Sequence, residues 1–313
     1  MSAGTFATEL ARFGPASRRR DVSLSEAKAY CRELARSHYE NFSVISWLLP
    51  KHLRQHFCNV YAYCRWADDL ADEVGSDAES LELLLWWREQ LAGCYEGRTY
   101  HPVFIALAGT IEEFRIPQGP FAALLDAFKR DQRQTRYATF DELLDYCRCS
   151  ANPVGHLVLY LGRCYEDESA RLSDSICTGL QLANFLQDIA NDYERGRIYL
   201  PQTTWDKFGY DEGCFAERVC DQRWRAMMQD ECTRASELLG AGWPLVDCVS
   251  RDLRFQVELF VRGGLAILKE IERAEYDVWT RRPTVGKLTK ANLVASTWLS
   301  KWLGVRTRKQ NHG

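Results

Sequence analysis

The sequence predicts an all-α protein with a single domain, in which helices enclose a central cavity. Apolar residues recur at helical spacing along most of the chain, and no convincing stretch alternates strictly between apolar and polar residues. No Pro- or Ser-rich linker divides the 313 residues. Because ligand sites in helical bundles form from inward side chains of facing helices, we expect the functional residues to line that cavity.

The first predicted helix is defined by its N-terminal residues. Ser23 or Ser25 is a suitable N-cap for a helix that extends through Arg36, and Glu26 follows Ser23 at the spacing of a capping box. The residues before it, 1–20, are expected to form a flexible segment. A helical domain over 21–303 and a basic tail over 304–313 complete the expected organisation.

Helical periodicity continues along the rest of the chain. Pro50 opens a helix that ends near Gly75, since a residue without a Cβ suits a helix terminus. Further helices are predicted over 79–95, 101–114, 118–129, 140–164, 173–194, 212–239, 244–276 and 287–303. The segment 196–213 contains proline and glycine and is expected to be a surface connection, with a lid as a further hypothesis.

Composition narrows the classes of function. The formal net charge of -3 provides no basic field for nucleic acid, so a nucleic-acid partner is not expected. The twelve cysteines are scattered and the N-terminus lacks an apolar signal-peptide core, which favours reduced thiols in a cytoplasmic protein. No apolar run approaches the length of a membrane-spanning helix.

An acidic series lies in the helix that follows Pro50. Tyr61, Arg65, Asp68 and Asp72 are spaced by four, three and four residues, which places them on one face of that helix. Unpaired charges are costly against an apolar core, so this face is either solvated or lines a polar cavity.

A second acidic series favours the cavity. Asn184, Asp188 and Asp192 are each four residues apart, within QLANFLQDIANDYERGRIYLP. Carboxylates that meet in a cavity repel one another unless cations neutralise them. Mg²⁺ prefers oxygen ligands and is commonly held by a few carboxylates together with substrate phosphate oxygens. The two series therefore predict a magnesium site that receives a diphosphate.

The segments YAYCRWADDLADE and NFLQDIANDYERGRIYLP resemble the two aspartate-rich signatures of the squalene/phytoene synthase family. Both signatures are long and specific, and the likeness extends from about Ala29 to about Lys290. The resemblance implies an isoprenoid-synthase helical bundle and an enzyme that ionises a prenyl diphosphate with the help of Mg²⁺.

The resemblance also implies roles for individual residues. The expected ligands of about two or three Mg²⁺ ions are Asp68, Asp72, Asn184, Asp188 and Asp192. The expected catalytic set is Asp68, Asp72, Asp188, Asp192, Tyr61, Tyr146 and Asn152. The expected substrate-binding set is Arg65, Asn184, Phe42, Asn41, Gln187 and Arg197.

Two stretches indicate a branch of that family. SHYENFSVISWLLP at 37–50 and YCRCSANPVGHLVL at 146–159 resemble the hydroxysqualene synthase branch of hopanoid-forming bacteria. Condensing relatives usually show a serine-rich S-x-S-F stretch where this chain has YENF, and A-G-x-V-G where it has ANPVG. The likeness implies that presqualene diphosphate loses diphosphate and captures water to give hydroxysqualene.

Such a reaction needs aromatic faces for a cation and a polar group for the attacking water. Phe42, Tyr146 and Phe185 are candidates for the first role, with core packing as the alternative for each. The candidates for the second role, among which the sequence does not choose, are Glu40, Asn41, Asn152 and His156. Arg195 and Arg197 either grip the diphosphate when a loop closes or are exposed charges.

Other reactions are considered beside this one. No dinucleotide-binding motif is present, so NADPH is not expected. Head-to-head condensation of prenyl diphosphates to presqualene diphosphate, squalene or phytoene is the alternative reaction, and only a reductive squalene synthase would need NADPH. A non-catalytic lipid-binding or assembly protein is an alternative of another class, disfavoured because all four metal carboxylates are retained.

The C-terminal stretch 281–313 holds eight Lys and Arg residues and no acid, with leucine and tryptophan interleaved. It either rests on an anionic membrane surface or caps the bundle core. Presqualene diphosphate is the expected small-molecule partner. Peripheral membrane contact and handover with other enzymes of the hopanoid pathway are further hypotheses, because the substrate and product are hydrocarbon chains.

Overall fold

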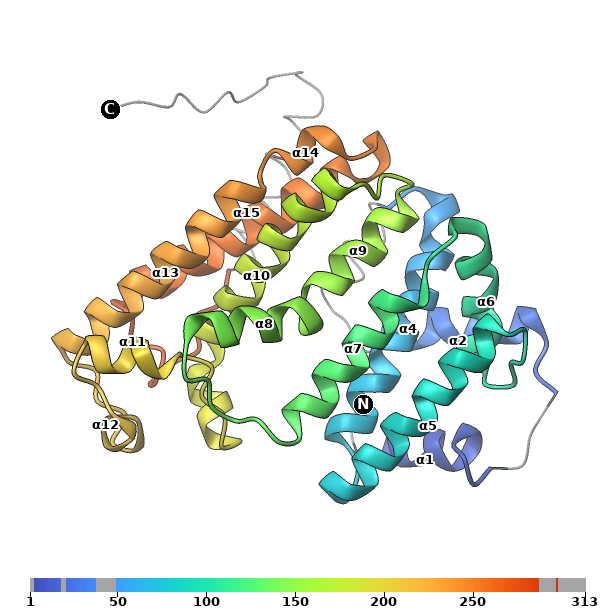
Figure 1. Ribbon diagram of the computed structural model, residues 1–313, viewed down its shortest axis with the longest axis horizontal. Helices are drawn as coiled ribbons and strands as arrows, with labels where there is room; N and C mark the ends of the chain where they lie inside the picture. The colour runs from blue at the N-terminus through green and yellow to red at the C-terminus, as the bar shows by residue number, and fades with distance from the viewer. Residues whose placement is uncertain (1–2, 18–20, 38–48, 287–296, 298–313) are drawn as a thin grey trace.

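The computed structural model of the protein describes residues 3–17, 21–37, 49–286 and 297 (Figure 1). Over these residues the chain forms α-helices and their connections with no β-strand, which confirms the all-α prediction. None of the helices in the described ranges combines the length and apolar character needed to cross a membrane. The expected helix 287–303, apart from Thr297, and the basic tail lie outside these residues.

The helices fall into two groups joined by α8 and α9 (Figure 1). The N-terminal group consists of α1 (Ala3–Phe13), α2 (Leu24–Ser37), α4 (Lys51–Asp72), α5 (Asp77–Tyr95), α6 (Pro102–Phe114) and α7 (Gln118–Asp131). The connecting pair is α8 (Phe140–Ser150) and α9 (Asn152–Leu161). The C-terminal group consists of α10 (Asp167–Glu194), α11 (Gln202–Lys207), α12 (Glu212–Ala216), α13 (Gln222–Gly242), α14 (Leu245–Cys248) and α15 (Arg251–Arg273).

Helix α10 is the central element of the C-terminal group and packs against α8, α9, α13 and α15. Its closest neighbour is α13, and small residues make this approach possible. A Cβ added to Gly242 would lie 2.4 Å from Cγ1 of Ile176 and 2.7 Å from the carbonyl oxygen of Leu172. A larger residue at Gly242 would therefore push α13 away from the helix that carries the second acidic series.

An aromatic cluster forms the core of the N-terminal group. Trp66 of α4 and Trp87 of α5 stack with ring centroids 5.3 Å apart and an interplanar angle of 12°. Phe104 of α6 contacts the Trp87 ring, and so does His101, the residue before that helix. Burial of these rings ties α4, which carries the first acidic series, to α5 and α6.

Several helix ends follow from local chemistry. The capping box predicted for α2 is confirmed: the Ser23 hydroxyl accepts from the Glu26 backbone, and the Glu26 carboxylate accepts from the Ser23 backbone. The single helix predicted over 140–164 is wrong, because the chain breaks at Ala151 into α8 and α9. Pro153 lacks an N–H, so it could not bond to the Cys149 carbonyl in a continuous helix and is instead accommodated in the first turn of α9.

Two other long helices are also divided. The prediction over 212–239 is replaced by α12 and α13, with Asp221 as the N-cap of the second. The prediction over 244–276 is replaced by α14 and α15, which are separated by extended backbone at Val249. In contrast, α10 begins earlier than expected, at Asp167, after a capping box formed by Glu166 and Ser169.

Two expectations about loops are corrected. The N-terminal segment expected to be flexible contains α1, whose Phe6 is buried and packs edge-on against Trp66. The segment 196–213 is not a simple surface connection, since it contains α11 and buries Trp205 and Tyr210. These aromatic side chains attach both segments to the core.

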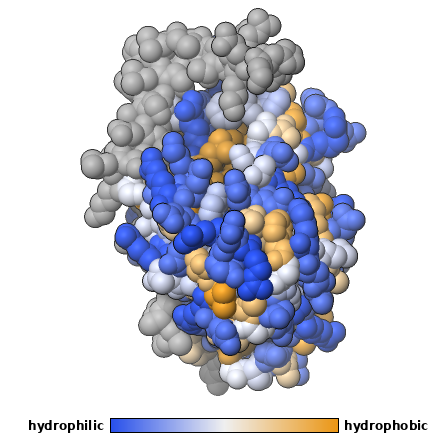
Figure 2. All heavy atoms as spheres, turned by 90° about the vertical axis from the view of Figure 1, so that its left-hand side faces the viewer, coloured by the Kyte–Doolittle hydropathy of each residue, from blue (hydrophilic) through white to orange (hydrophobic). Residues whose placement is uncertain are grey.

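The surface on the side of α11 to α13 is mostly hydrophilic, with separate hydrophobic residues between the polar ones (Figure 2). Large apolar side chains that are exposed among the described residues are Leu24, Leu85 and Val154. They come from three different helices, so this part of the chain shows no continuous apolar face built from large side chains.

Candidate active site

The first acidic series lies at the C-terminal end of α4, as its spacing predicts. Arg65 Nη1 donates to Asp68 Oδ2 over 2.9 Å, and Nη2 donates to Glu73 Oε1 over 3.3 Å. Arg65 also donates to Asp69, which is 1% exposed. Burial raises the pKa of Asp69 to about 6, although the Arg65 charge opposes that shift. Asp69 therefore anchors Arg65, while Asp68 and Asp72 remain partly exposed.

Tyr61 lies one turn before Arg65 and is half-buried, and its hydroxyl is close enough to affect the pKa of Arg65. The structure thus places the predicted group Tyr61, Arg65 and Asp68 together along one side of α4. Phe42 and Asn41, together with Glu40, lie outside the described residues.

The second acidic series lies near the end of α10. Asn184 is exposed, and burial together with the charge of Asp188 raises the pKa of Asp192 to about 7. Asp188 is held by Arg282, whose Nη2 donates to Oδ2 over 2.9 Å and whose Nε donates to Oδ1. Asn191 also donates to Asp188 Oδ1, over 3.4 Å.

Gln187 holds the segment that contains Arg282. Its side-chain amide donates to the carbonyl oxygen of Pro283 over 2.6 Å, and its Oε1 accepts from Arg282 Nη2 over 3.2 Å. Gln187 is buried, so the structure places this predicted substrate-binding residue under the segment that follows α15. Arg282 itself was missed by sequence reasoning, although it stands in an Arg-Arg-Pro run at 281–283, after α15.

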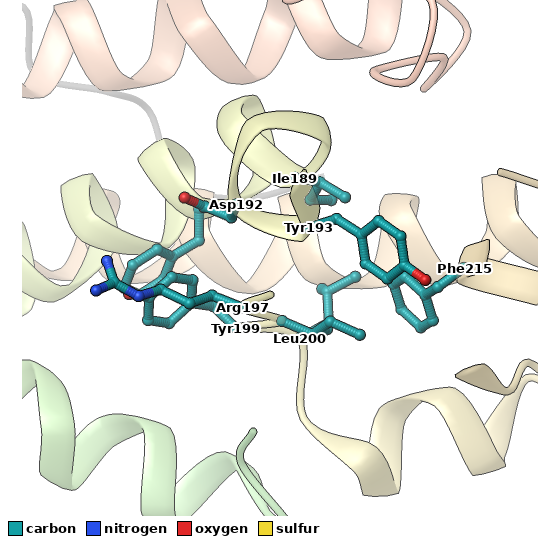
Figure 3. Close-up of a pocket in the computed structure, with 9 residues that line it drawn as sticks. Ile189, Asp192, Tyr193, Arg197, Tyr199, Leu200 and Phe215 are labelled. Atoms are coloured by element: carbon teal, nitrogen blue, oxygen red, sulfur yellow. The ribbon is translucent and has the colours of Figure 1, made fainter. Parts of the chain in front are cut away.

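Arg197 connects the two acidic series. Its Nη2 lies 3.9 Å from Asp72 Oδ1 of the first series. Arg197 also lines a small pocket with Asp192 of the second series, and the two side chains extend to the same side of it (Figure 3). Although burial opposes its charge, the neighbouring Tyr199, Asp131 and Asp72 raise the pKa of Arg197. The predicted Arg197 is thus inside the site, whereas Arg195 is exposed.

Aromatic rings form one wall of this pocket. Phe185 and Tyr199 stack with centroids 3.9 Å apart, and both line the pocket with Asp192 and Arg197. Tyr146 of α8 lies behind them, with its ring centroid 5.8 Å from that of Tyr199 and 6.2 Å from that of Phe185. The predicted cavity residues Tyr146 and Phe185 therefore share one cluster.

Asp131, the last residue of α7, joins this cluster and was missed by sequence reasoning. The Tyr146 hydroxyl donates to Asp131 Oδ2 over 2.8 Å. Oδ1 is buried and has no hydrogen-bond partner among the described residues. Burial raises the pKa of Asp131 to about 6, although Tyr146 and Arg197 oppose the shift. A lone acid within the basic run KRDQRQTR is the sequence signal that could have pointed to it.

Two of the residues proposed to hold water are engaged elsewhere. Asn152 is buried, and its Oδ1 accepts a hydrogen bond from the Thr178 hydroxyl over 3.0 Å, between α9 and α10. His156 Nε2 lies 2.8 Å from Asp174 Oδ1, one turn farther along the same pair of helices. These contacts join the two helices to each other.

The side chains of the site offer oxygen ligands of the kind that a magnesium ion prefers. No group of three or more His, Cys, Asp or Glu side chains in the described part of the chain is already gathered as a metal cluster. Mg²⁺ bound through one or two carboxylates, substrate phosphate and water does not require such a cluster. Burial and, after it, the charge of Asp188 raise the pKa of Asp192, and a bound cation would relieve the repulsion between these two carboxylates. The residues present therefore fit the ion.

Comparison with known proteins gives a consistent result. The squalene/phytoene synthase family profile matches residues 35–289. The crystal structure of squalene synthase HpnC from Alicyclobacillus acidocaldarius superposes with a TM-score of 0.78 at 43% identity, covering 82% of this chain and 97% of that one.

Phytoene synthases are also similar along most of their length. That of Arthrospira platensis is 31% identical over 280 residues, which cover 85% of this chain and 91% of the relative. The 15-cis-phytoene synthase of a Synechocystis strain is 30% identical over 290 residues, covering 89% and 86%. Arg197 lies near an aspartate of each series, and the family profile covers most of the chain, so this chain belongs to the squalene/phytoene synthase family.

Proposed function

We propose that this protein converts presqualene diphosphate to hydroxysqualene, releasing diphosphate and capturing water. The supporting observation is the polarity of the site: Asp192 and Arg197, with Asp72 close to Arg197, provide charged groups, and stacked aromatic rings form the adjoining wall. The first environment suits a departing diphosphate and the second suits a carbocation. The 43% identity to a protein described as squalene synthase HpnC supports this branch of the family.

The metal would be held by Asp68, Asp72, Asp188 and Asp192, with Asn184 as a further oxygen ligand. When bound, Mg²⁺ would supply a Lewis acid that neutralises charge on the diphosphate, with about two or three ions expected. Arg65 and Arg197 supply fixed positive charge on the same site. Phe185 and Tyr199 exclude water from the pocket wall that they form. No NADPH is used in this proposal, because water ends the reaction.

The segment that contains Arg282 competes with a metal for Asp188. We expect Arg282→Ala to bind Mn²⁺, used as a probe for Mg²⁺, roughly threefold to tenfold more tightly without substrate, since a cation no longer displaces a guanidinium. Calorimetric titration of the substrate-free protein measures this affinity. Arg281→Ala removes the exposed neighbouring charge and serves as the control. Equal affinities in both variants and the unsubstituted protein would contradict the competition.

Head-to-head condensation is the second candidate. It is supported by the similarity to phytoene synthases, which covers 85% of this chain and 91% of the Arthrospira platensis relative. One experiment separates the two reactions. Purified protein with Mg²⁺ and without NADPH is incubated separately with presqualene diphosphate and with farnesyl or geranylgeranyl diphosphate, and the products are identified by mass spectrometry. Hydroxysqualene that contains ¹⁸O from labelled water, formed only from presqualene diphosphate, supports the first reaction. A C30 or C40 product from farnesyl or geranylgeranyl diphosphate supports the second.

The expected membrane contact and handover of product to other enzymes of the hopanoid pathway remain part of this proposal. Both follow from the chemistry of the proposed substrate and product, which are long hydrocarbon chains.

A further inference from the structure

The two oxygens of the Asp131 carboxylate differ in their hydrogen bonding. One oxygen accepts the Tyr146 hydroxyl hydrogen bond over 2.8 Å, and the other is buried with no partner among the residues that the structure describes. An acceptor buried without a partner lowers stability, so its presence requires an explanation. A structural role alone would be served by an uncharged side chain that bonds Tyr146.

Nearby arginines do not pair with Asp131. Arg130 on the same helix donates instead to Asp145 over 2.9 Å and to Gln134 over 2.6 Å. The nearest ion pair of Arg197 is with Asp72 at 3.9 Å. Arg197 and Asp72 nevertheless lie close enough for their charges to affect the pKa of Asp131. Asp131, whose Oδ1 has no hydrogen-bond partner in the described ranges, therefore lies close to charged residues of the site.

Charged and aromatic side chains from several helices and connections surround Asp131. The groups that face Asp131 are Asp72 from α4, Arg130 from α7, Tyr137 from the following connection, Tyr146 from α8, and Arg197 and Tyr199 after α10. The tyrosines keep their protons at neutral pH because burial raises their pKa values. Among these groups Asp131 is the carboxylate that has a buried oxygen without a hydrogen-bond partner in the described residues, so it can accept a proton there.

Resting on the proposed function, we propose that Asp131 is the base that accepts the proton of the water molecule trapped by the carbocation. A lone pair of the water oxygen forms the new C–O bond to the cationic carbon. The O–H bond of that water breaks, and its proton passes to Asp131 Oδ1. The products are a neutral alcohol and a neutral carboxylic acid, which later returns its proton to solvent. Tyr146 positions the carboxylate through Oδ2.

The ratio of alcohol to hydrocarbon products tests the role of Asp131 as a base separately from the loss of diphosphate. With presqualene diphosphate as substrate, diphosphate release and the ratio of alcohol to hydrocarbon are measured for the unsubstituted protein and for Asp131→Asn. We expect release to change by no more than about tenfold, and the alcohol ratio to fall about 10²-fold or more, because removal of a general base has an effect of that size. The cation would then lose a proton from carbon to the released diphosphate.

Asp126→Asn is the matched control, since it makes the same chemical change at an exposed carboxylate of α7 that pairs with Arg88. We expect alcohol to remain its major product. An unchanged alcohol ratio in Asp131→Asn would overturn the assignment, as would an equal fall in both variants. Absence of alcohol from the unsubstituted protein would instead overturn the proposed function, so the two failures are distinguishable.

A pH profile of the unsubstituted protein covers the case in which Asp131→Asn does not fold. Burial raises the pKa of Asp131 to about 6, so the base is ionised above that pH and protonated below it. We expect the alcohol ratio to fall between about pH 8 and about pH 5 while diphosphate is still released. A ratio that is flat across this range would overturn the assignment.

Discussion

Asp192→Asn is expected to lower the rate of diphosphate release by about 10³-fold, equivalent to about 4 kcal/mol of lost transition-state stabilisation. Asp192 lines the pocket with Arg197, and the charge of neighbouring Asp188 acts on its pKa. The substitution keeps the side-chain volume and removes the charge that attracts a divalent cation. Single-turnover release of diphosphate from presqualene diphosphate at saturating Mg²⁺ measures the effect.

Glu194→Gln is the control for that substitution. It makes the same chemical change half a turn farther along α10, where Glu194 is exposed and pairs with Arg218 over 2.9 Å. We expect its release rate to stay within about twofold of the unsubstituted protein, since an exposed ion pair contributes little. Comparable losses in the two variants would show that general acidity of the helix end, and not the position of Asp192, supports the reaction.

Trp87→Ala is expected to lower the free energy of unfolding by about 3–5 kcal/mol, the range for removal of a large buried aromatic side chain. The Trp87 ring is fully buried and lies between Trp66 and Phe104, with centroid distances of 5.3 and 4.5 Å. Its loss leaves a cavity where α4, α5 and α6 meet. Denaturant unfolding followed by circular dichroism measures the change.

Leu85→Ala provides the matched control on the same helix. Leu85 is 51% exposed, so its truncation is expected to change stability by less than about 0.5 kcal/mol. A similar midpoint for both variants would mean that the aromatic cluster does not unfold in the measured transition.

The parts of the site with a helical period were predictable from the sequence. Asp68 and Asp72, like Asp188 and Asp192, lie one turn apart, and the structure places each pair near the end of one helix. The same periodicity could not show that Asp69 would be buried against Arg65, because that depends on how α4 packs.

Residues brought in by tertiary structure were not predictable in this way. Asp131 and Tyr146 belong to different helices and meet through the packing of α7 against α8. Arg282 reaches Asp188 across 94 residues of sequence. The break at Ala151, in contrast, had a local signal in the sequence, because a proline in the interior of a helix removes a hydrogen bond and clashes with the preceding turn.

The packing of α10 also determines which parts of the protein can adapt to a substrate. This helix is covered by α8, α9, α13 and α15, and its residues Leu182, Phe185, Leu186 and Ile189 are buried. We expect its amide hydrogens in that stretch to exchange with deuterium among the slowest in the chain, because their exposure requires unfolding of the surrounding helices. Mass spectrometry of exchange with and without Mg²⁺ and diphosphate measures this, and rapid exchange there would contradict it. We therefore expect the second acidic series to keep its position when a substrate binds.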